Sequence, residues 1–252
     1  MKRTVVVPDL QVPLHDPVAV ANVTAYIKAV RPDSVVTLGD EADFTEIGRW
    51  SEGKPGWYEQ TLAENRDMTV DILWRLGEYA KDQHMIRSNH TDRLFNVIMN
   101  KIPSFLSLPE LRFEKFMKLD ELGITYHKKP YAIARGYIAV HGDEQSIKPQ
   151  PGLTALDAAR RHGISVICGH THRAGQSAFT EASGGKIGRI IRGYEGGHLM
   201  SPKLAHYTKG TMNWQQAFIV IEEVGTNVQV SIINLEKDGT FVVSGKRYGR
   251  AR

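Results

Sequence analysis

The sequence has 252 residues, of which 41% are hydrophobic and 24% are charged, and its formal net charge is +4. We expect residues 1–252 to form a single α/β domain, because this length is sufficient to bury a core of its own. No apolar run approaches the roughly 18 residues of a membrane span. The single cysteine, Cys168, excludes an intramolecular disulfide. These properties predict a soluble protein without a membrane partner, in a reducing, cytoplasmic setting.

The excess positive charge coincides with the C-terminal tail. The last seven residues contain four cations and no acid, which equals the whole net charge: Lys246, Arg247, Arg250 and Arg252. We interpret this tail as a solvated, partly frayed terminus. Contact with the phosphate backbone of a nucleic acid is the alternative interpretation.

The N-terminal part of the chain alternates strands and helices. Residues 4–8 have the pattern of a buried strand, and Asp16-Pro17 predicts the cap and first turn of a helix that continues to about residue 30. Residues 34–38 form the next apolar strand. This order of strand, helix and strand is typical of a parallel unit in an α/β fold.

The middle of the chain continues the alternation. The expected elements are a helix at 60–82, a strand near 85–87, a mainly helical insertion around 93–122, a strand at 137–140, a helix at 153–162 and a strand at 164–168. Pro103 and Pro109 would interrupt the insertion, since proline cannot continue a helix.

After residue 175 the sequence becomes rich in β-branched residues. Five such runs are separated by breaks that contain glycine: 176–182, 187–193, 216–223, 227–235 and 240–246. They predict a second, mainly antiparallel or mixed sheet. The expected fold class is therefore α/β, with two packed mixed β-sheets flanked by helices.

Metal-competent side chains directly follow five of the predicted strands. The five blocks are Asp9-Leu10-Gln11, Gly39-Asp40-Glu41-Ala42-Asp43, Ser88-Asn89-His90, His141-Gly142-Asp143 and Gly169-His170-Thr171-His172. In open α/β sheets, ligands collect at the carboxyl ends of the strands. Carboxylate oxygen, amide oxygen and imidazole nitrogen together suit Mn, Fe, Zn, Ni or Co. The blocks therefore predict a metal site.

In this order, the five blocks resemble the calcineurin-like metallophosphoesterase family, including the compact members that bacteriophages encode. The family pattern is D-x-H, G-D-x-x-D, G-N-H-D/E, a lone histidine and G-H-x-H, and the match extends from Asp9 to His172. The resemblance implies the αββα sandwich of the metallophosphoesterases. It also implies a metal-dependent hydrolase that acts on phosphoric ester bonds.

The resemblance assigns a role to each matching residue. Asp40 would bridge two metal ions. The other implied ligands are Asp9, Gln11 and His172 for the first ion, and Asn89, His141 and His170 for the second. His90 would protonate the leaving oxygen, and Asp43 would orient His90 and raise its pKa. The two divalent ions, with Mn favoured over Fe, Zn, Ni, Co or Mg, would share the hydroxide that attacks phosphorus.

The sequence departs from the family pattern in two blocks. Gln11 stands where the family has histidine; its amide oxygen can bind Mg or Mn, or the side chain can point away while a water takes the position. Ser88 replaces the glycine of the third block. The acid of that block comes one position late, at Asp92, where we expect it to cap the following helix.

Several neighbouring residues have less specific patterns. We interpret Glu41 as a variable loop position and Cys168 as a core residue. Asp143 would support His141 or close a turn, and Arg173 would hold a substrate phosphate or be solvated. Among the histidines outside the blocks, His198 is the best candidate for a substrate contact.

The expected reaction is phosphodiester hydrolysis, with some monoesterase activity, on nucleotide-type or cyclic-nucleotide substrates. A nuclease is the alternative within enzymes, supported by the basic tail and by Trp50 and Trp57, which can stack on bases. A non-catalytic scaffold on the same fold is the alternative from another class, and Gln11 is the feature that favours it. The physiological substrate and the oligomeric state stay open.

Overall fold

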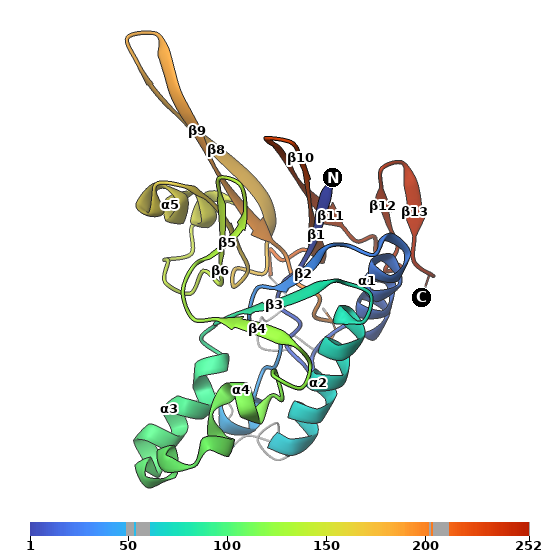
Figure 1. Ribbon diagram of the computed structural model, residues 1–252, viewed down its shortest axis with the longest axis vertical. Coiled ribbons are helices and arrows are strands. Elements are labelled where there is room, and N and C mark those ends of the chain that lie inside the picture. Colours follow the sequence, from blue (N-terminus) through green and yellow to red (C-terminus); the bar gives the residue numbers. More distant parts are fainter. Residues whose placement is uncertain (49–52, 54–60, 202, 204–211, 252) are drawn as a thin grey trace.

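In the computed structural model, residues 1–48, 53, 61–201, 203 and 212–251 are described. Two large β-sheets pack against each other, and helices cover their outer faces (Figure 1). The expected fold class is confirmed. Trp50, Trp57 and Arg252 lie outside the described residues.

The first sheet has six strands and contains the parallel unit. Its order is β11-β10-β1-β2-β3-β4, in which β1 to β4 run parallel and β10 pairs antiparallel with β1. The strands are β1 (Lys2–Val7), β2 (Ser34–Thr37), β3 (Asp82–Ile86), β4 (Ile124–His127), β10 (Ala217–Val224) and β11 (Asn227–Asn234). β1 is thus a central strand, with Val6 opposite Val36 on one side and Ile219 on the other.

The second sheet has five strands in the order β5-β6-β7-β9-β8. Its central strands β6, β7 and β9 are parallel, and both edge strands are antiparallel to their neighbours. The strands are β5 (Tyr131–Ala134), β6 (Tyr137–Val140), β7 (Ser165–Cys168), β8 (Ala174–Ser183) and β9 (Lys186–Gly196). Strands β4 and β5 are short and were not among the predicted elements.

The predicted composition of the second sheet is wrong in part. The runs 176–182 and 187–193 do form β8 and β9 of that sheet. However, 216–223 and 227–235 become β10 and β11 of the first sheet, and 240–246 forms a separate hairpin. An alternating pattern indicates that a strand is half-buried but does not identify its partner. The partner of β10 is β1, at the other end of the chain.

The long helices cover the outer faces of both sheets. α1 (Pro17–Val30) and α2 (Leu62–Gly77) lie on the first sheet, and α5 (Leu153–His162) lies on the second. The carboxylate of Asp16 caps α1 by accepting hydrogen bonds from two backbone amides of its first turn. No helix among the described residues is both long and apolar enough to cross a bilayer.

Helix α2 ends at Gly77, earlier than the predicted boundary at residue 82. The side chain of Gln83 folds back over this end, and its Nε2 donates to the carbonyl of Leu73 at 2.9 Å. A Cβ atom at position 77 would lie 2.0 Å from Gln83 Oε1, so glycine permits the close approach. The amide of Gln83 therefore satisfies a carbonyl that the helix end leaves open.

The segment 93–122 is mainly helical, as predicted. It contains α3 (Thr91–Lys101), two 3₁₀ turns (Pro103–Ser107 and Pro109–Leu111) and α4 (Phe113–Phe116). Each of the two prolines begins a 3₁₀ turn, where its missing amide hydrogen costs no helical bond.

The main core lies between the two sheets. Val6 and Val36 of the first sheet pack in one cluster with Ile167 and Tyr194 of the second. The alternate residues of β1, such as Val5, face α1 instead. Cys168 is buried under α5, as predicted.

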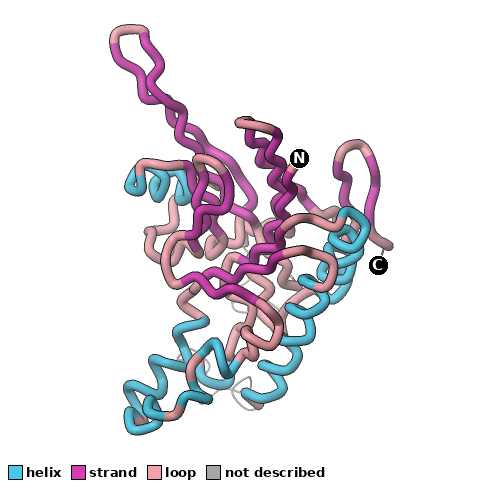
Figure 2. Tube along the Cα trace, in the orientation of Figure 1, coloured by secondary structure: helices cyan, strands magenta, loops and turns pink. Residues whose placement is uncertain are grey.

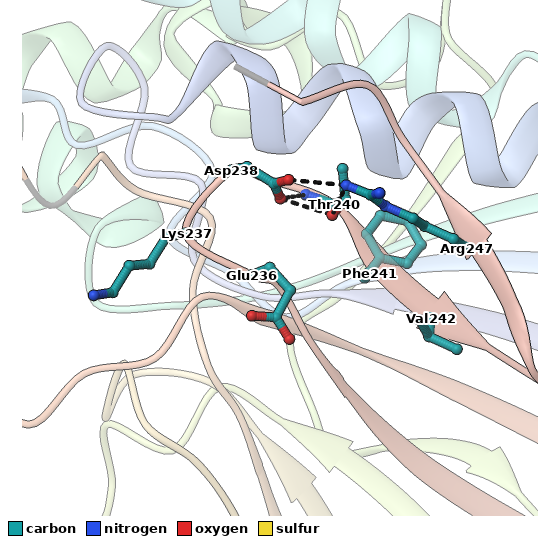
Figure 3. A pocket seen from close by; sticks show the side chains of 7 residues that line it. All are labelled: Glu236, Lys237, Asp238, Thr240, Phe241, Val242 and Arg247. Carbon is teal, nitrogen blue, oxygen red and sulfur yellow. Dashed lines mark hydrogen bonds and ion pairs between the residues drawn. The ribbon is translucent and has the colours of Figure 1, made fainter.

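The C-terminal tail is ordered through Arg250, which corrects the expectation of a frayed terminus. Strands β12 (Phe241–Val243) and β13 (Lys246–Tyr248) form a hairpin. Arg247 donates to Asp238 at 3.0 Å beside the shallow hollow shown in Figure 3. The backbone amide of Arg250 donates to Asn22 of α1 at 2.9 Å. These hydrogen bonds hold the tail in place, while Lys246, Arg247 and Arg250 remain exposed to solvent, as expected.

Phe241 is the anchor of this hairpin, since it is 1% exposed and packs against the rings of Tyr26 and Phe218. We expect Phe241→Ala to lower the free energy of unfolding by about 3–5 kcal/mol, because it leaves a cavity. Val242→Ala is the control: this neighbour is 57% exposed and should change stability by less than about 0.5 kcal/mol. Urea denaturation measures both. Equal effects of the two substitutions would contradict the anchoring role.

Candidate metal centre

The predicted site residues converge at the carboxyl ends of β1, β2, β3, β6 and β7. Five of them have left-handed backbone conformations: Asp9 (φ 27°), Gln11 (φ 53°), Asp40 (φ 55°), His170 (φ 64°) and His172 (φ 56°). Such conformations cost roughly 1–3 kcal/mol for residues other than glycine, and they cluster at functional sites. The turns that follow the strands therefore place these side chains at the expense of backbone strain.

Two glycines allow the close packing of this site. A Cβ atom on Gly39, whose φ is +92°, would lie 2.6 Å from Ser88 Cβ and 2.9 Å from His141 Nδ1. A Cβ atom on Gly169 would lie 2.4 Å from an Asp9 carboxylate oxygen. Both positions therefore require glycine, because any larger residue would displace a ligand side chain.

Two groups of side chains could each hold a metal ion, and Asp40 belongs to both. One group consists of Asp40, His141 and His170, and the other of Asp9, Asp40 and His172. Within each group, one candidate ligand atom per residue lies within 4.8 Å of the others. A carboxylate has two oxygens, so Asp40 can serve both groups at once.

In the group around His141, several oxygen and nitrogen atoms with lone pairs face one another at short distances. His141 Nδ1 lies 2.8 Å from the carbonyl oxygen of Leu38, which can only accept a hydrogen bond, so Nδ1 carries the proton. His141 Nε2 then faces Asp40 Oδ1 at 3.3 Å, Asn89 Oδ1 at 3.0 Å and His170 Nδ1 at 3.2 Å. Oxygen and nitrogen lone pairs meet there, so a second proton or a metal cation must lie between them.

The group around Asp9 also contains Gln11, which points into the site. Its Nε2 donates to Asp40 Oδ2 at 2.9 Å, so the alternative in which the side chain points away is wrong. Gln11 Oε1 is buried without a hydrogen-bond partner among the described residues. A buried polar atom without a partner is costly unless a cation or water satisfies it. Together with the Asp40 carboxylate, this oxygen therefore fits a divalent metal ion.

The charges of the site divide unequally in the absence of a metal ion. Burial alone would lower the pKa of His141, yet the adjacent Asp40 carboxylate and its hydrogen bond raise it to about 10. Burial and the proximity of His141 lower the pKa of His170 to about 4. Burial raises the pKa of Asp9, because it disfavours the charged carboxylate. His141 therefore carries its proton at neutral pH and forms a buried ion pair with Asp40, 3.3 Å away.

Metal binding must displace the second proton of His141, the one on Nε2 that faces Asp40. The proton on Nδ1 stays in its hydrogen bond to the Leu38 carbonyl. Because the folded-state pKa of His141 is raised above its ordinary value of about 6.5, the Nε2 proton stays bound across neutral pH and is lost only toward pH 10. Metal affinity should therefore rise with pH over this range, by about tenfold per unit for each proton released. Calorimetric titration with Mn in two buffers of different ionisation enthalpy measures that release. A heat independent of the buffer would contradict the prediction.

His90 lies beside the two groups, at the start of α3, and is 8% exposed. Its Nε2 is 3.6 Å from Asp40 Oδ2, and its Nδ1 is 3.5 Å from Asp43 Oδ1. Burial and the charge of Arg93 lower the pKa of His90 and outweigh the carboxylates beside it. Asp43 nevertheless acts in the expected direction, since its charge and that of Asp40 raise this pKa.

Arg93 is a site residue that the sequence did not reveal. Its Nη2 lies 2.6 Å from His90 Nε2, and its Nη1 donates to the backbone carbonyl of Asp43. The available signal was its spacing, because residues three apart on a helix lie on the same face. Arg93 therefore connects His90 to the turn that carries Asp43.

Asp143 and Asp92 have a different partner from the expected ones. Asp143 does not contact the imidazole of His141, which is bound to a backbone carbonyl, and Asp92 does not cap α3. Both carboxylates pair with Arg87, at 2.7 Å and 2.5 Å respectively. Arg87 follows β3, so this triad fastens the His90 segment to the loop after His141.

Arg173 neither faces solvent nor is free to hold a phosphate, which corrects both interpretations. It is 6% exposed, its Nε lies 3.4 Å from Glu195 Oε2, and its Nη1 donates to two backbone carbonyls. Glu195 is completely buried and also accepts hydrogen bonds from Thr171 Oγ1 and Thr154 N, both at 2.9 Å. Since Thr171 lies between two candidate ligands, Glu195 holds their turn.

Loss of the Glu195 carboxylate should be strongly destabilising. Glu195→Ala leaves Arg173 buried without its partner, which costs about 3–5 kcal/mol. Glu181→Ala is the matched control, because it removes an exposed carboxylate that pairs with Arg189 and should cost less than about 1 kcal/mol. Chemical denaturation of the metal-free protein compares them. Similar losses for both variants would show that the buried network does not hold the turn.

Two other interpretations from the sequence also change. Glu41 is 1% exposed and accepts a hydrogen bond from the amide of Gly39, so it supports the Asp40 turn and is not a variable loop position. Burial raises the pKa of Glu41 to about 7. His198 is 2% exposed, and its ring lies 5.6 Å from that of His172. It packs behind a candidate ligand and does not face a substrate.

The two packed sheets, their outer helices and the ligand groups at the strand ends define the αββα sandwich of the metallophosphoesterase fold. Vacuolar Protein Sorting 29 from Cryptosporidium parvum has a similar structure, with a TM-score of 0.50 and 14% identity over 99% of this chain and 98% of that one. At this identity the likeness shows the fold.

Sequence comparison identifies nearer relatives. The chain is 31% identical over 250 residues to the Gene 54 protein of Mycobacterium phage D29, with 97% of each protein covered. It is 30% identical over 253 residues to the Gene 54 protein of Mycobacterium phage L5, with 97% of this chain and 98% of the relative covered. The chain therefore belongs to the family of these phage proteins. No protein-family model matches the chain.

Proposed function

We propose that this protein is a metal-dependent phosphoesterase of the calcineurin-like family. The observation that carries the proposal is the shared position of Asp40, whose carboxylate belongs to both ligand groups. His90 lies 3.6 Å from the same carboxylate. Two adjacent cation positions with a proton donor beside them are the arrangement that phosphoryl transfer requires.

The residues of the two groups would hold two divalent cations, with Mn as the leading candidate. Asp9, Gln11 and His172 would surround one position, and Asn89, His141 and His170 the other. Oxygen and imidazole donors without thiolate suit Mn, Fe, Zn, Ni or Co, and the amide of Gln11 favours Mn over softer metals. When bound, the ions would activate water and neutralise the charge that develops on the phosphoryl group.

The chain's own contribution to the reaction would come from His90. Its ring lies beside the carboxylate shared by the two groups, where it would give a proton to the leaving oxygen. Because the Arg93 guanidinium can only donate, its contact with Nε2 would have to open when that nitrogen carries the proton. Asp43 on its Nδ1 side and Arg93 on its Nε2 side fix the position of the ring. We therefore treat Asp43 and Arg93 as positioning residues for His90.

We infer that the substrates are phosphodiesters of the nucleotide type, including cyclic nucleotides. This choice rests on the resemblance to compact family members, and the two phage relatives support a phage-type protein. Hydrolysis of a chromogenic bis-phosphodiester and of 2′,3′- and 3′,5′-cyclic nucleotides, with each divalent metal in turn, tests the proposal. If the Mn-loaded protein hydrolyses none of these substrates, the proposed phosphodiesterase activity is overturned. Single-stranded and duplex DNA in the same panel test the nuclease alternative.

His90→Ala should lower kcat by about 10²–10⁴-fold, because a general acid contributes that much to catalysis. The bound metal should not change, since His90 belongs to neither ligand group. His162→Ala is the control, because His162 is exposed at the end of α5. Metal analysis by mass spectrometry accompanies the kinetics. Metal loss in His90→Ala, or unchanged turnover, would contradict the role of His90.

The non-catalytic alternative makes a different prediction for the same preparation. A scaffold would bind almost no metal and would show no Mn-stimulated turnover. The inward position of Gln11 and its own buried Oε1, which has no hydrogen-bond partner among the described residues, favour metal binding, because a centre without ions would leave that oxygen unsatisfied.

A further inference from the structure

Strands β8 and β9 form a long two-stranded ribbon that extends well beyond the rest of the second sheet (Figures 1 and 2). The pairing continues from Ala174 with Gly196 to Ser183 with Lys186. In its outer part nearly every residue is exposed, including Ile187 at 67% and Ile190 at 42%. An isolated hairpin is only marginally stable in water, so its persistence needs support from elsewhere.

Two contacts with α5 provide this support. The guanidinium of Arg160 lies 4.1 Å from the ring centroid of Phe179. Arg189 pairs with Glu181 across the ribbon and donates to the carbonyl of Gly163, which follows α5. The face of the ribbon that carries Phe179 and Arg189 therefore forms one surface with the C-terminal end of α5.

This ribbon surface is strongly basic. Residues 153–196 contain six Lys or Arg and three acids. Arg173 and Glu195 are buried against each other and do not contribute to the surface. The remaining cations are Arg160, Arg161, Lys186, Arg189 and Arg192, against Asp157 and Glu181. Three net positive charges therefore lie on the ribbon and the adjacent helix end, compared with four for the whole chain.

We propose that the ribbon and the C-terminal end of α5 bind duplex DNA. The excess of three positive charges on this protruding element complements the phosphate backbone, although Arg161 and Arg189 also pair with Asp157 and Glu181. The major groove of B-form DNA admits a two-stranded β-ribbon. The major groove of A-form RNA is too narrow for such an element, so the shape favours DNA.

The proposed DNA contact is separate from the metal centre. β8 begins directly after Arg173, beside the His172 turn, and runs away from it for ten residues. At about 3.3 Å per residue, the tip of the ribbon lies roughly 30 Å from that turn. Binding by the ribbon therefore requires neither metal nor hydrolysis, and it stands apart from the proposed phosphoesterase activity.

The test measures binding of the full chain to a fluorescently labelled duplex of mixed sequence, by anisotropy, in EDTA and at several salt concentrations. The test variant is Arg161→Glu/Lys186→Glu. Arg161 has a side chain that is 62% exposed, and Lys186 is exposed without an ion pair among the described residues. Both leave intact the contacts of Arg160 and Arg189 that hold the ribbon.

Lys129→Glu/Lys237→Glu is the control with the same change in net charge. Both lysines are exposed, and they lie outside the ribbon and α5. We expect wild type and control to bind with affinity that falls steeply with salt. The test variant should bind at least about tenfold more weakly at low salt, and its salt slope should be shallower by about two.

Several outcomes would overturn the inference. These are no binding of duplex DNA by the wild type, equal weakening in both double variants, or a preference for duplex RNA or for anionic vesicles. Loss of a concentration-dependent dimer in the test variant, without DNA binding by the wild type, would instead indicate a dimerisation arm. Hydrolysis of a small chromogenic diester should be the same in all variants. A wild type that binds DNA but hydrolyses nothing would overturn the proposed function alone.

Discussion

The contact between Asp40 and His141 is the constraint on which the rest of the centre depends. It joins the end of a strand in the first sheet to the end of a strand in the second, across the layer between them. Both side chains are almost completely buried, so each needs the other in the absence of a metal ion. The two sheets must therefore pack in one relative position. The ligand groups are complete only in that position.

The supporting residues are arranged around this contact in two networks, one partly buried and one fully buried. Arg87 with its two carboxylates fixes the segment that carries His90, and Glu195 with Arg173 fixes the turn that carries His170 and His172. In both cases a charged side chain bridges elements that are distant in the sequence. Such networks position ligands without contacting a substrate, because they restrict the rotamers and turns of the residues that do.

Much of the site could be predicted from the sequence, because each ligand directly follows a strand and the backbone brings strand ends together. The partners of Arg87, Arg173 and Glu195 could not, since nothing local marks which charges will be buried together. The same limit applies to the sheets: the residues of β10 indicate a strand, but its pairing with β1 depends on the assembled core. Arg93 was missed for a different reason, because its helical spacing from His90 matters only once His90 is known to face the centre.

The central position of β1 also has a consequence for synthesis of the chain on the ribosome. Strand β1 is made long before one of its two neighbours, β10, which ends at residue 224. Until then a growing chain presents an apolar edge with unpaired amides and carbonyls, the kind of edge that recruits strands from other molecules. The first sheet therefore closes only after β10 has been synthesised. Expression of shortened chains that stop before β10 would yield aggregates, whatever the integrity of their metal ligands.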